Sequence, residues 1–214
     1  HTRWATHGVP SSANSHPHTS GSISVVHNGI IENHNLLKKE LRDRGATLSS
    51  ETDSEVIAHL IEFYSSETGS LKEAVNKTLS RLEGAYAICV SSKDYPDKMI
   101  GARSGSPLVI GLGIGEHFMA SDQMALRQVT DRFIYLEEGD VAEVSKNEIS
   151  VFDDNGELVE REINQINESD LLAEKGEYKH FMLKEIFEQP RVIDECLTGR
   201  ISGSKIIQSV FGHK

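Results

Sequence analysis

The second half of this chain is a close succession of short strand-like runs, and that pattern limits the possible folds more than any other feature. Gly residues and an Asp-Asn-Gly turn punctuate the runs. Short strands at close spacing favour antiparallel sheets. The expected strands are residues 85–92, 98–103, 107–113, 117–121, 132–137, 140–145 and 148–153.

The part of the chain before Gly84 is mainly helical by its apolar periodicity. A short β-rich run comes first and ends at a dipeptide that is typical of turns. The expected elements are a strand at 22–27, a turn at Asn28-Gly29, a helix at 32–44, a second helix capped by Thr52 or Asp53, and a third helix at about 71–82. Helices beside many short strands predict a layered α+β domain.

The last part of the chain differs in composition from the rest. Residues 155–178 are polar, mostly acidic and poor in aromatic residues, which is typical of a connector. Residues 180–197 predict a helix that Pro190 should kink or split. With 214 residues, the chain can bury one sizeable core and at most a short extension.

Charge and composition argue against several classes of function. The formal net charge is −11, and residues 137–177 carry all of it, with 14 acidic and 3 basic residues. Because no basic patch exists elsewhere, nucleic acid is not an expected partner. No apolar run reaches the roughly 18 residues of a membrane span, so no membrane association is expected. Cys89 and Cys196 lie far apart without a metal-type spacing, and a reducing cytoplasm is the expected location.

Six of the ten histidines fall within the first 34 residues, at His1, His7, His16, His18, His27 and His34. A metal site is one interpretation, because His16 and His18 flank a single proline. A structural zinc site usually adds cysteines or a second ordered pair, and the sequence has neither. We therefore expect no metal, and interpret these histidines as loop residues that hydrogen-bond to the backbone.

Another set of polar residues in the same region suits an amino-acid substrate. Arg3 can pair with a carboxylate, and Asp53, at a helix start, can pair with an ammonium group. Asn28 offers a side-chain amide and Gly29 an unobstructed backbone N–H, and two such donors at one point stabilise an oxyanion in acyl transfer. From the residues alone, Asn28-Gly29 stays open to interpretation as a turn and Asp53 as a helix cap.

Three blocks carry a family resemblance, namely His1-Thr-Arg-Trp-Ala-Thr-His-Gly8, His27-Asn-Gly-Ile-Ile-Glu-Asn-His34 and Glu51-Thr-Asp-Ser-Glu-Val-Ile-Ala-His59. In this order they resemble the signatures of the amidotransferases with an N-terminal nucleophile. Later blocks at 84–87, 102–113, 120–126 and 136–140 agree, so the resemblance covers nearly the whole chain. Residues 1–8 and 184–190 are most similar to the members that make glucosamine 6-phosphate from fructose 6-phosphate and glutamine.

The resemblance implies a four-layer αββα sandwich and a glutaminase reaction. In the family, an N-terminal cysteine attacks the side-chain amide of glutamine, and its own α-amino group acts as the base. Ammonia leaves, and water then releases glutamate from a thioester. No cofactor is implied.

The resemblance also implies roles for single residues. The charged pair would hold the two ends of the amino acid, and a closing loop would keep ammonia from water. By motif match, Arg3 holds the α-carboxylate of L-glutamine, Asp53 holds its α-ammonium, Asn28 and Gly29 form the oxyanion hole, Thr6 and His7 lie in the closing loop, and Trp4 helps to gate the departure of ammonia.

The same resemblance divides the chain into residues 1–154 as a partial glutaminase domain, 155–178 as an acidic connector, and 179–214 as the start of a linker to a sugar-phosphate isomerase domain. The nucleophile would precede His1 and the isomerase domain would follow Lys214, so the printed chain is expected to be N-terminally truncated and inactive by itself. Expected partners are L-glutamine, L-glutamate, the isomerase domain of the parent chain and further copies in a homo-oligomer. Two alternatives stay open. One is another family member, such as glutamine phosphoribosyl-pyrophosphate amidotransferase or asparagine synthetase, and the other is a noncatalytic glutamine sensor.

Overall fold

A computed structural model describes residues 1, 3, 6–166, 177–197, 201–202 and 205–206. The chain forms two compact units, His1–Ile166 and Asn167–Lys214. In the second unit, helix α4 covers Phe181–Leu197, and strands β12 (Ile201–Ser202) and β13 (Lys205–Ile206) form an antiparallel pair. Within the described residues, no helix is both long enough and apolar enough to cross a membrane.

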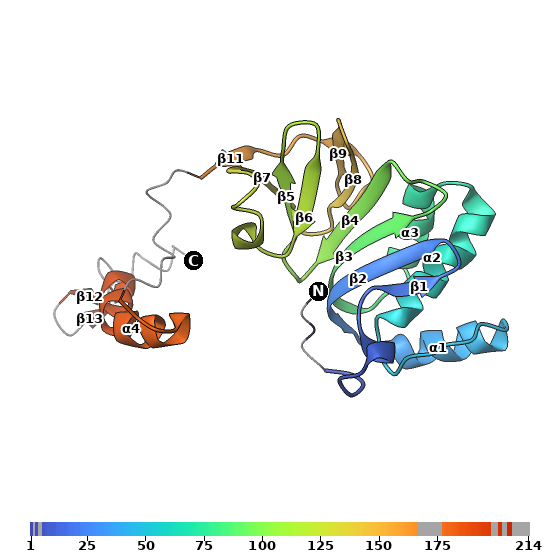
Figure 1. The fold of residues 1–214 in the computed structure, drawn as a ribbon, viewed down its shortest axis with the longest axis horizontal. Coiled ribbons are helices and arrows are strands. Elements are labelled where there is room, and N and C mark those ends of the chain that lie inside the picture. Colours follow the sequence, from blue (N-terminus) through green and yellow to red (C-terminus); the bar gives the residue numbers. More distant parts are fainter. Residues whose placement is uncertain (2, 4–5, 167–176, 198–200, 203–204, 207–214) are drawn as a thin grey trace. The chain divides into compact units, whose positions relative to one another are not determined.

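The first unit contains two antiparallel sheets (Figure 1). The larger sheet has seven strands in the order β1-β2-β3-β4-β8-β9-β10. Its strands are β1 (His18–Ser20), β2 (Ile23–Ile31), β3 (Gly84–Ser92), β4 (Lys98–Ser104), β8 (Val141–Ser145), β9 (Ile149–Phe152) and β10 (Leu158–Val159). The smaller sheet has the order β11-β7-β5-β6, with β5 (Val109–Leu112), β6 (His117–Ala120), β7 (Arg132–Tyr135) and β11 (Ile163–Gln165).

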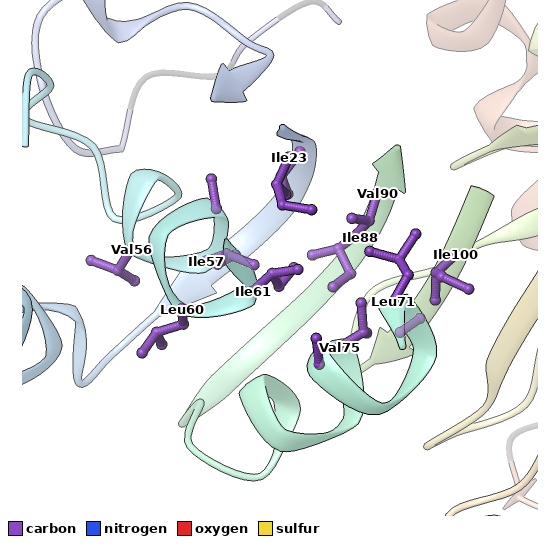
Figure 2. Packing of buried hydrophobic residues seen from close by; sticks show 14 of the residues in the cluster. Ile23, Val56, Ile57, Leu60, Ile61, Leu71, Val75, Ile88, Val90 and Ile100 are labelled. Carbon is purple, nitrogen blue, oxygen red and sulfur yellow. The ribbon is translucent and has the colours of Figure 1, made fainter. Parts of the chain in front are cut away.

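Three helices cover one face of the larger sheet. Helix α2 (Glu55–Thr68) contacts β1 and β2, α3 (Leu71–Leu79) contacts β4, and α1 (His34–Asp43) packs against α2. Two short 3-10 helices, Ser12–Asn14 and Gln123–Ala125, lie in loops. Figure 2 shows the apolar side chains of α2 and α3 pointing at those of β2, β3 and β4. This first core includes Ile23, Ile57, Ile61, Val75, Ile88 and Ile100, all fully buried.

A second core lies on the opposite face of the larger sheet. Side chains alternate between the faces of a strand, and β3 illustrates this. Ile88 and Val90 belong to the helix-side core, whereas Ala87 and Cys89 face the other way. There they meet Leu108, Ile110 and Ile134 of the smaller sheet region. The first unit is therefore layered as helices, larger sheet and smaller sheet.

The periodicity of the sequence predicts these elements well, and the α+β class is confirmed. All seven strands expected between 85 and 153 are present, as are the helices expected at 32–44 and 71–82, with ends that differ by a few residues. Within residues 6–166 the three α-helices all lie on the larger sheet's side. The second helical layer of an αββα sandwich is not formed by that part of the chain.

The predicted turn at Asn28-Gly29 is wrong, because both residues lie inside β2. They pair with Ala87 and Tyr86 of β3, and the strand continues to Ile31. Gly29 has φ +134°, and a Cβ atom there would lie 2.0 Å from the carbonyl oxygen of Ala85. A glycine is needed here for the close approach of two strands, not for a turn.

The predicted cap of the second helix is also wrong. Helix α2 begins at Glu55, and Ser54 occupies the N-cap position without a side-chain capping bond. The carboxylate of Asp53 accepts a hydrogen bond from the backbone N–H of Ile31 instead, at 2.8 Å. A long-range partner on β2 thus replaces the local role that the sequence predicts.

The structure differs from the sequence prediction at two further places, residues 155–178 and Pro190. Strands β10 and β11 fall within residues 155–178, for which composition predicts a connector, and the compact unit ends at Ile166. Residues 167–176 of that segment lie outside the described residues. Pro190 does not split its helix, because α4 continues from Phe181 to Leu197.

Candidate functional site

A pocket of about 280 Å³ lies where the end of β2 meets the start of α2. Five of the residues singled out in the sequence line it: Arg3, Thr6, Asn28, Gly29 and Asp53. His7 lies beside it, with its Nδ1 atom 3.9 Å from Oδ1 of Asp53. Trp4 lies outside the described residues. The fold therefore brings together residues that are up to 50 positions apart in the sequence.

Asp53 supplies a buried carboxylate to this pocket. Its Oδ2 atom is held by the Ile31 N–H, so the group is anchored on the strand that carries Asn28 and Gly29. Among the described residues, its Oδ1 atom has the His7 ring as its neighbour, at 3.9 Å. A carboxylate fixed by one oxygen presents the other to a cationic ligand.

Asn28 lines the pocket, and the oxygen of its amide is engaged by His1. Its Oδ1 atom lies 2.9 Å from Nε2 of His1. An amide oxygen can only accept, so His1 donates this hydrogen bond. The Nδ2 group donates to no described residue, and both Asn28 and Gly29 line the pocket. Two potential donors thus meet at one wall of the cavity.

Arg3 is engaged by its own loop. Its guanidinium group donates to the carbonyl oxygens of His7, Gly8 and Val9, the last two at 3.1 and 3.5 Å. Arg3 therefore binds the backbone of residues 7–9 while it also lines the pocket. The sequence places a cation here, but it does not predict these backbone partners.

The neighbouring histidines are kept neutral by their surroundings. Burial, followed by the nearby charges of His18, His27 and Arg3, lowers the pKa of His16 to about 4. Burial also lowers the pKa of His27, whose Nδ1 atom lies 2.8 Å from the hydroxyl of Ser54. The His16 ring stacks on His1, with 4.1 Å between ring centroids. The dense run of histidines in the sequence was the only signal for this cluster.

The sequence predicts that these histidines hydrogen-bond to the backbone. This is wrong for some of them. His34 does so through the carbonyl of Ile31, at 2.7 Å, whereas His27 and His18 face the hydroxyls of Ser54 and Thr52. Over the described residues, no three His, Cys, Asp or Glu side chains are grouped so as to hold a metal ion.

A second cavity, of about 370 Å³, adjoins the first and shares His1, His27 and Asn28 with it. It lies between the two sheets and is lined by apolar side chains that include Leu108 and Met119. Cys89 also lines it, and burial raises the pKa of the Cys89 thiol to about 12. A thiol with that pKa stays protonated near neutral pH and is a poor nucleophile.

Comparison with known families gives a match over the part of the chain that builds the pocket. Residues 1–128 match the family described as glutamine amidotransferase domain. This range contains all the pocket residues named above and the helix-side core except Val141.

Curated relatives match over nearly the whole chain. A protein of Aliivibrio fischeri named glutamine–fructose-6-phosphate aminotransferase (isomerizing) is 54% identical over 212 residues, which cover 99% of this chain and 35% of the relative. Proteins with the same name from Pseudomonas putida and Haemophilus influenzae are 53% and 52% identical, each with 35% of its length covered. The chain thus spans about a third of the length of these relatives.

Solved structures match the fold. Glutamine phosphoribosylpyrophosphate amidotransferase from B. subtilis, complexed with ADP and GMP, is similar with a TM-score of 0.60 and 28% identity, over 74% of this chain and 35% of that one. An allosteric regulatory enzyme of purine biosynthesis has a TM-score of 0.51 and 30% identity, over 62% of this chain and 28% of that one. The layered α+β fold is therefore one that amidotransferases share.

Proposed function

The chain belongs to the glutamine amidotransferase domain family, and from this premise we propose that its pocket binds L-glutamine and takes part in releasing ammonia from the side-chain amide. The observation that carries the proposal is the presence of one buried anion, Asp53, and one cation, Arg3, in the same small cavity as Asn28 and Gly29. An α-amino acid needs opposite charges for its two ends.

The proposed binding mode uses both charges. The α-ammonium group of glutamine pairs with Oδ1 of Asp53, the oxygen that the backbone of Ile31 does not occupy. The α-carboxylate pairs with the guanidinium of Arg3, which turns part of its donor fork from the loop carbonyls to the ligand. Thr6 and His7, on the loop that Arg3 folds, close over the bound amino acid. Trp4 has the proposed role of gating the departing ammonia.

The proposed chemistry uses the donors on β2. When a thiolate attacks the side-chain amide of glutamine, negative charge develops on the amide oxygen. The Nδ2 group of Asn28 and the N–H of Gly29 would stabilise that charge. The nucleophile stays the N-terminal cysteine that the family resemblance implies, because burial disfavours the thiolate of Cys89.

For the whole protein, we propose that the ammonia is passed to fructose 6-phosphate to give glucosamine 6-phosphate. Support comes from the relatives at 52 to 54% identity that carry the name glutamine–fructose-6-phosphate aminotransferase. Because this chain spans 35% of their length, the sugar would be handled by an isomerase domain of the same parent chain. A cytoplasmic location and a homo-oligomeric parent are part of the same proposal. The phosphoribosylpyrophosphate enzyme is the weaker alternative, at 28% identity.

The experiment that tests glutamine binding is isothermal titration of L-glutamine into the 214-residue chain, after circular dichroism has established that it is folded. We expect saturable binding in the unaltered chain. Asp53→Asn and Arg3→Ala should each weaken it by roughly 2–4 kcal/mol, since each removes one partner of a charge pair. Equal affinity in a folded Asp53→Asn variant would contradict the proposed site.

Asn28→Ala is the matched control, because it leaves both charges in place. It should bind glutamine with nearly unchanged affinity. In the full-length gene product it should lower glutaminase turnover by roughly 10²- to 10³-fold, since one oxyanion donor is lost. Binding without any turnover in the unaltered gene product would instead favour a glutamine sensor.

A further inference from the structure

Asn14 and Glu51 lie outside the proposed ligand contacts. They hydrogen-bond the segment around Val9 to the segment that precedes Asp53. Asn14 donates from Nδ2 to the carbonyl oxygen of Val9 at 2.9 Å and to Oε2 of Glu51 at 3.2 Å. Its Oδ1 atom accepts from the backbone N–H of Glu51 at 2.9 Å. The same Oε2 atom of Glu51 accepts from the backbone N–H of Val9 at 3.3 Å. We call Asn14 and Glu51 the clamp.

The Asn14 side chain of the clamp is buried and hydrogen-bonded at both ends of its amide. The Asn14 side chain is only 3% exposed, and both ends of its amide are occupied, so its orientation is fixed by its partners. Gly8 lies against it with φ +76°, and a Cβ atom at Gly8 would come within 2.7 Å of Nδ2 of Asn14 and 3.0 Å of Cβ of Glu51. Any residue other than glycine would push the loop off the clamp.

The clamp connects the two chain segments that carry the charges of the pocket. On one side, the carbonyl oxygen of Val9 that Asn14 holds also accepts from Arg3, at 3.5 Å. On the other side, Glu51 precedes Asp53 by two residues. Among the described residues of the loop, the His7 ring comes within 3.9 Å of Asp53, too far for a hydrogen bond. Asn14 and Glu51 therefore supply hydrogen bonds that join the segment accepting from Arg3 to the segment that carries Asp53.

We infer that Asn14 and Glu51 are positioning residues that set the distance between Arg3 and Asp53, and so fit the pocket to the zwitterionic end of an α-amino acid. This inference rests on the proposed function of the pocket. Loss of the clamp should weaken binding of the ground state and the transition state equally, because the reacting amide is at the other end of the ligand. KM for glutamine then rises while kcat at saturation is kept.

The test uses the full-length gene product with glutamine as the variable substrate. Asn14→Asp removes both donated hydrogen bonds and places a second carboxylate against Glu51. We expect KM for glutamine to rise roughly 10- to 100-fold with kcat within about twofold, as befits the loss of buried hydrogen bonds. The double variant Asn14→Asp with Glu51→Gln removes the repulsion between the two carboxylates and lets the new amide donate to the aspartate, so it should regain part of the lost affinity, while the donor to the carbonyl oxygen of Val9 stays lost.

Glu160→Gln is the matched control, because it neutralises an exposed carboxylate on the connection between β10 and β11. It should leave KM and kcat unchanged. The inference is overturned if Asn14→Asp leaves KM unchanged, or if kcat and the free energy of unfolding fall together with no recovery in the double variant. Failure of the proposed function is seen separately, since the unaltered protein would then bind no glutamine.

Discussion

At the scale of single residues, burial lowers the pKa of the histidines around the pocket and so favours their neutral form. His16, His18 and His27 all have their pKa lowered chiefly by desolvation, and His59 behind them has too. Neutral rings can stack and accept hydrogen bonds at close range, as His16 does from the backbone N–H of His27 at 3.4 Å. A charged ring in the same place would repel Arg3. The cluster therefore favours an intact pocket only while it stays unprotonated.

This charge state predicts how stability depends on pH. His16 has a pKa of about 4 when folded, against an ordinary value of 6.5, so between these values the unfolded chain binds more protons. The free energy of unfolding should therefore fall as pH is lowered from about 6.5 to about 4. Urea unfolding at a series of pH values measures it, and His16→Gln should show a shallower decline. An equal slope in that variant would contradict the assignment to His16.

The sequence predicts some site residues and misses others for a physical reason. Arg3 and Asp53 were found because their charges suit an amino acid and their blocks resemble a family. Asn14 lies outside the blocks that carry the resemblance, and Glu51 begins one of them without an implied role, because an asparagine and a glutamate 37 positions apart look like ordinary loop residues until the chain folds. Hydrogen bonds between distant segments leave no periodic pattern in a sequence.

At the scale of secondary structure, the packing of α2 on the larger sheet supports the whole site. Its fully buried Ile57 faces the sheet in Figure 2, and the segment that leads into α2 carries Asp53. Ile57→Ala should lower the free energy of unfolding by roughly 2–5 kcal/mol, because it leaves a cavity in a packed core. Urea denaturation checks this.

Leu36→Ala is the control for that variant. It removes the same kind of side chain from α1, but Leu36 is 58% exposed. A change within about 0.5 kcal/mol is expected. If both variants lost the same free energy, helix propensity and not burial would be the cause.

Elements with strong apolar periodicity could be predicted from the sequence, and those set by tertiary pairing could not. The strands between residues 85 and 153 have alternating or continuous apolar residues. The sequence therefore predicts their ends to within a few residues. Strands β10 and β11 have only two and three residues in an acidic segment, so composition hides them. At Asn28-Gly29 a local turn preference competes with nine-residue pairing between β2 and β3, and the pairing wins.

At the scale of the whole molecule, both hydrophobic cores lie within the unit His1–Ile166. We expect a chain cut after Ile166 to unfold cooperatively and to keep its glutamine affinity. Urea unfolding and calorimetric titration of residues 1–166 measure both. A broad, non-cooperative transition would show that the rest of the chain is needed for folding.

A cut after residue 154, where composition places the domain boundary, should behave differently. It removes β11 from the edge of the smaller sheet, and it removes Arg161. The guanidinium of Arg161 donates to both oxygens of Asp140, at 2.9 and 2.8 Å, and Asp140 is fully buried. Leaving that carboxylate without its partner should cost roughly 3–5 kcal/mol. This shorter chain is therefore the matched comparison for residues 1–166.

The close approach of Gly29 to the neighbouring strand β3 also limits which variants of this gene can encode a folded protein. Every missense change of a glycine codon adds a Cβ atom, and at this position that atom would overlap the carbonyl oxygen of Ala85. By contrast, Leu36 of α1 is 58% exposed and does not line the pocket. Among natural variants of this gene, the codon for Gly29 should accumulate silent substitutions alone, while the codon for Leu36 should also accumulate substitutions that change the residue.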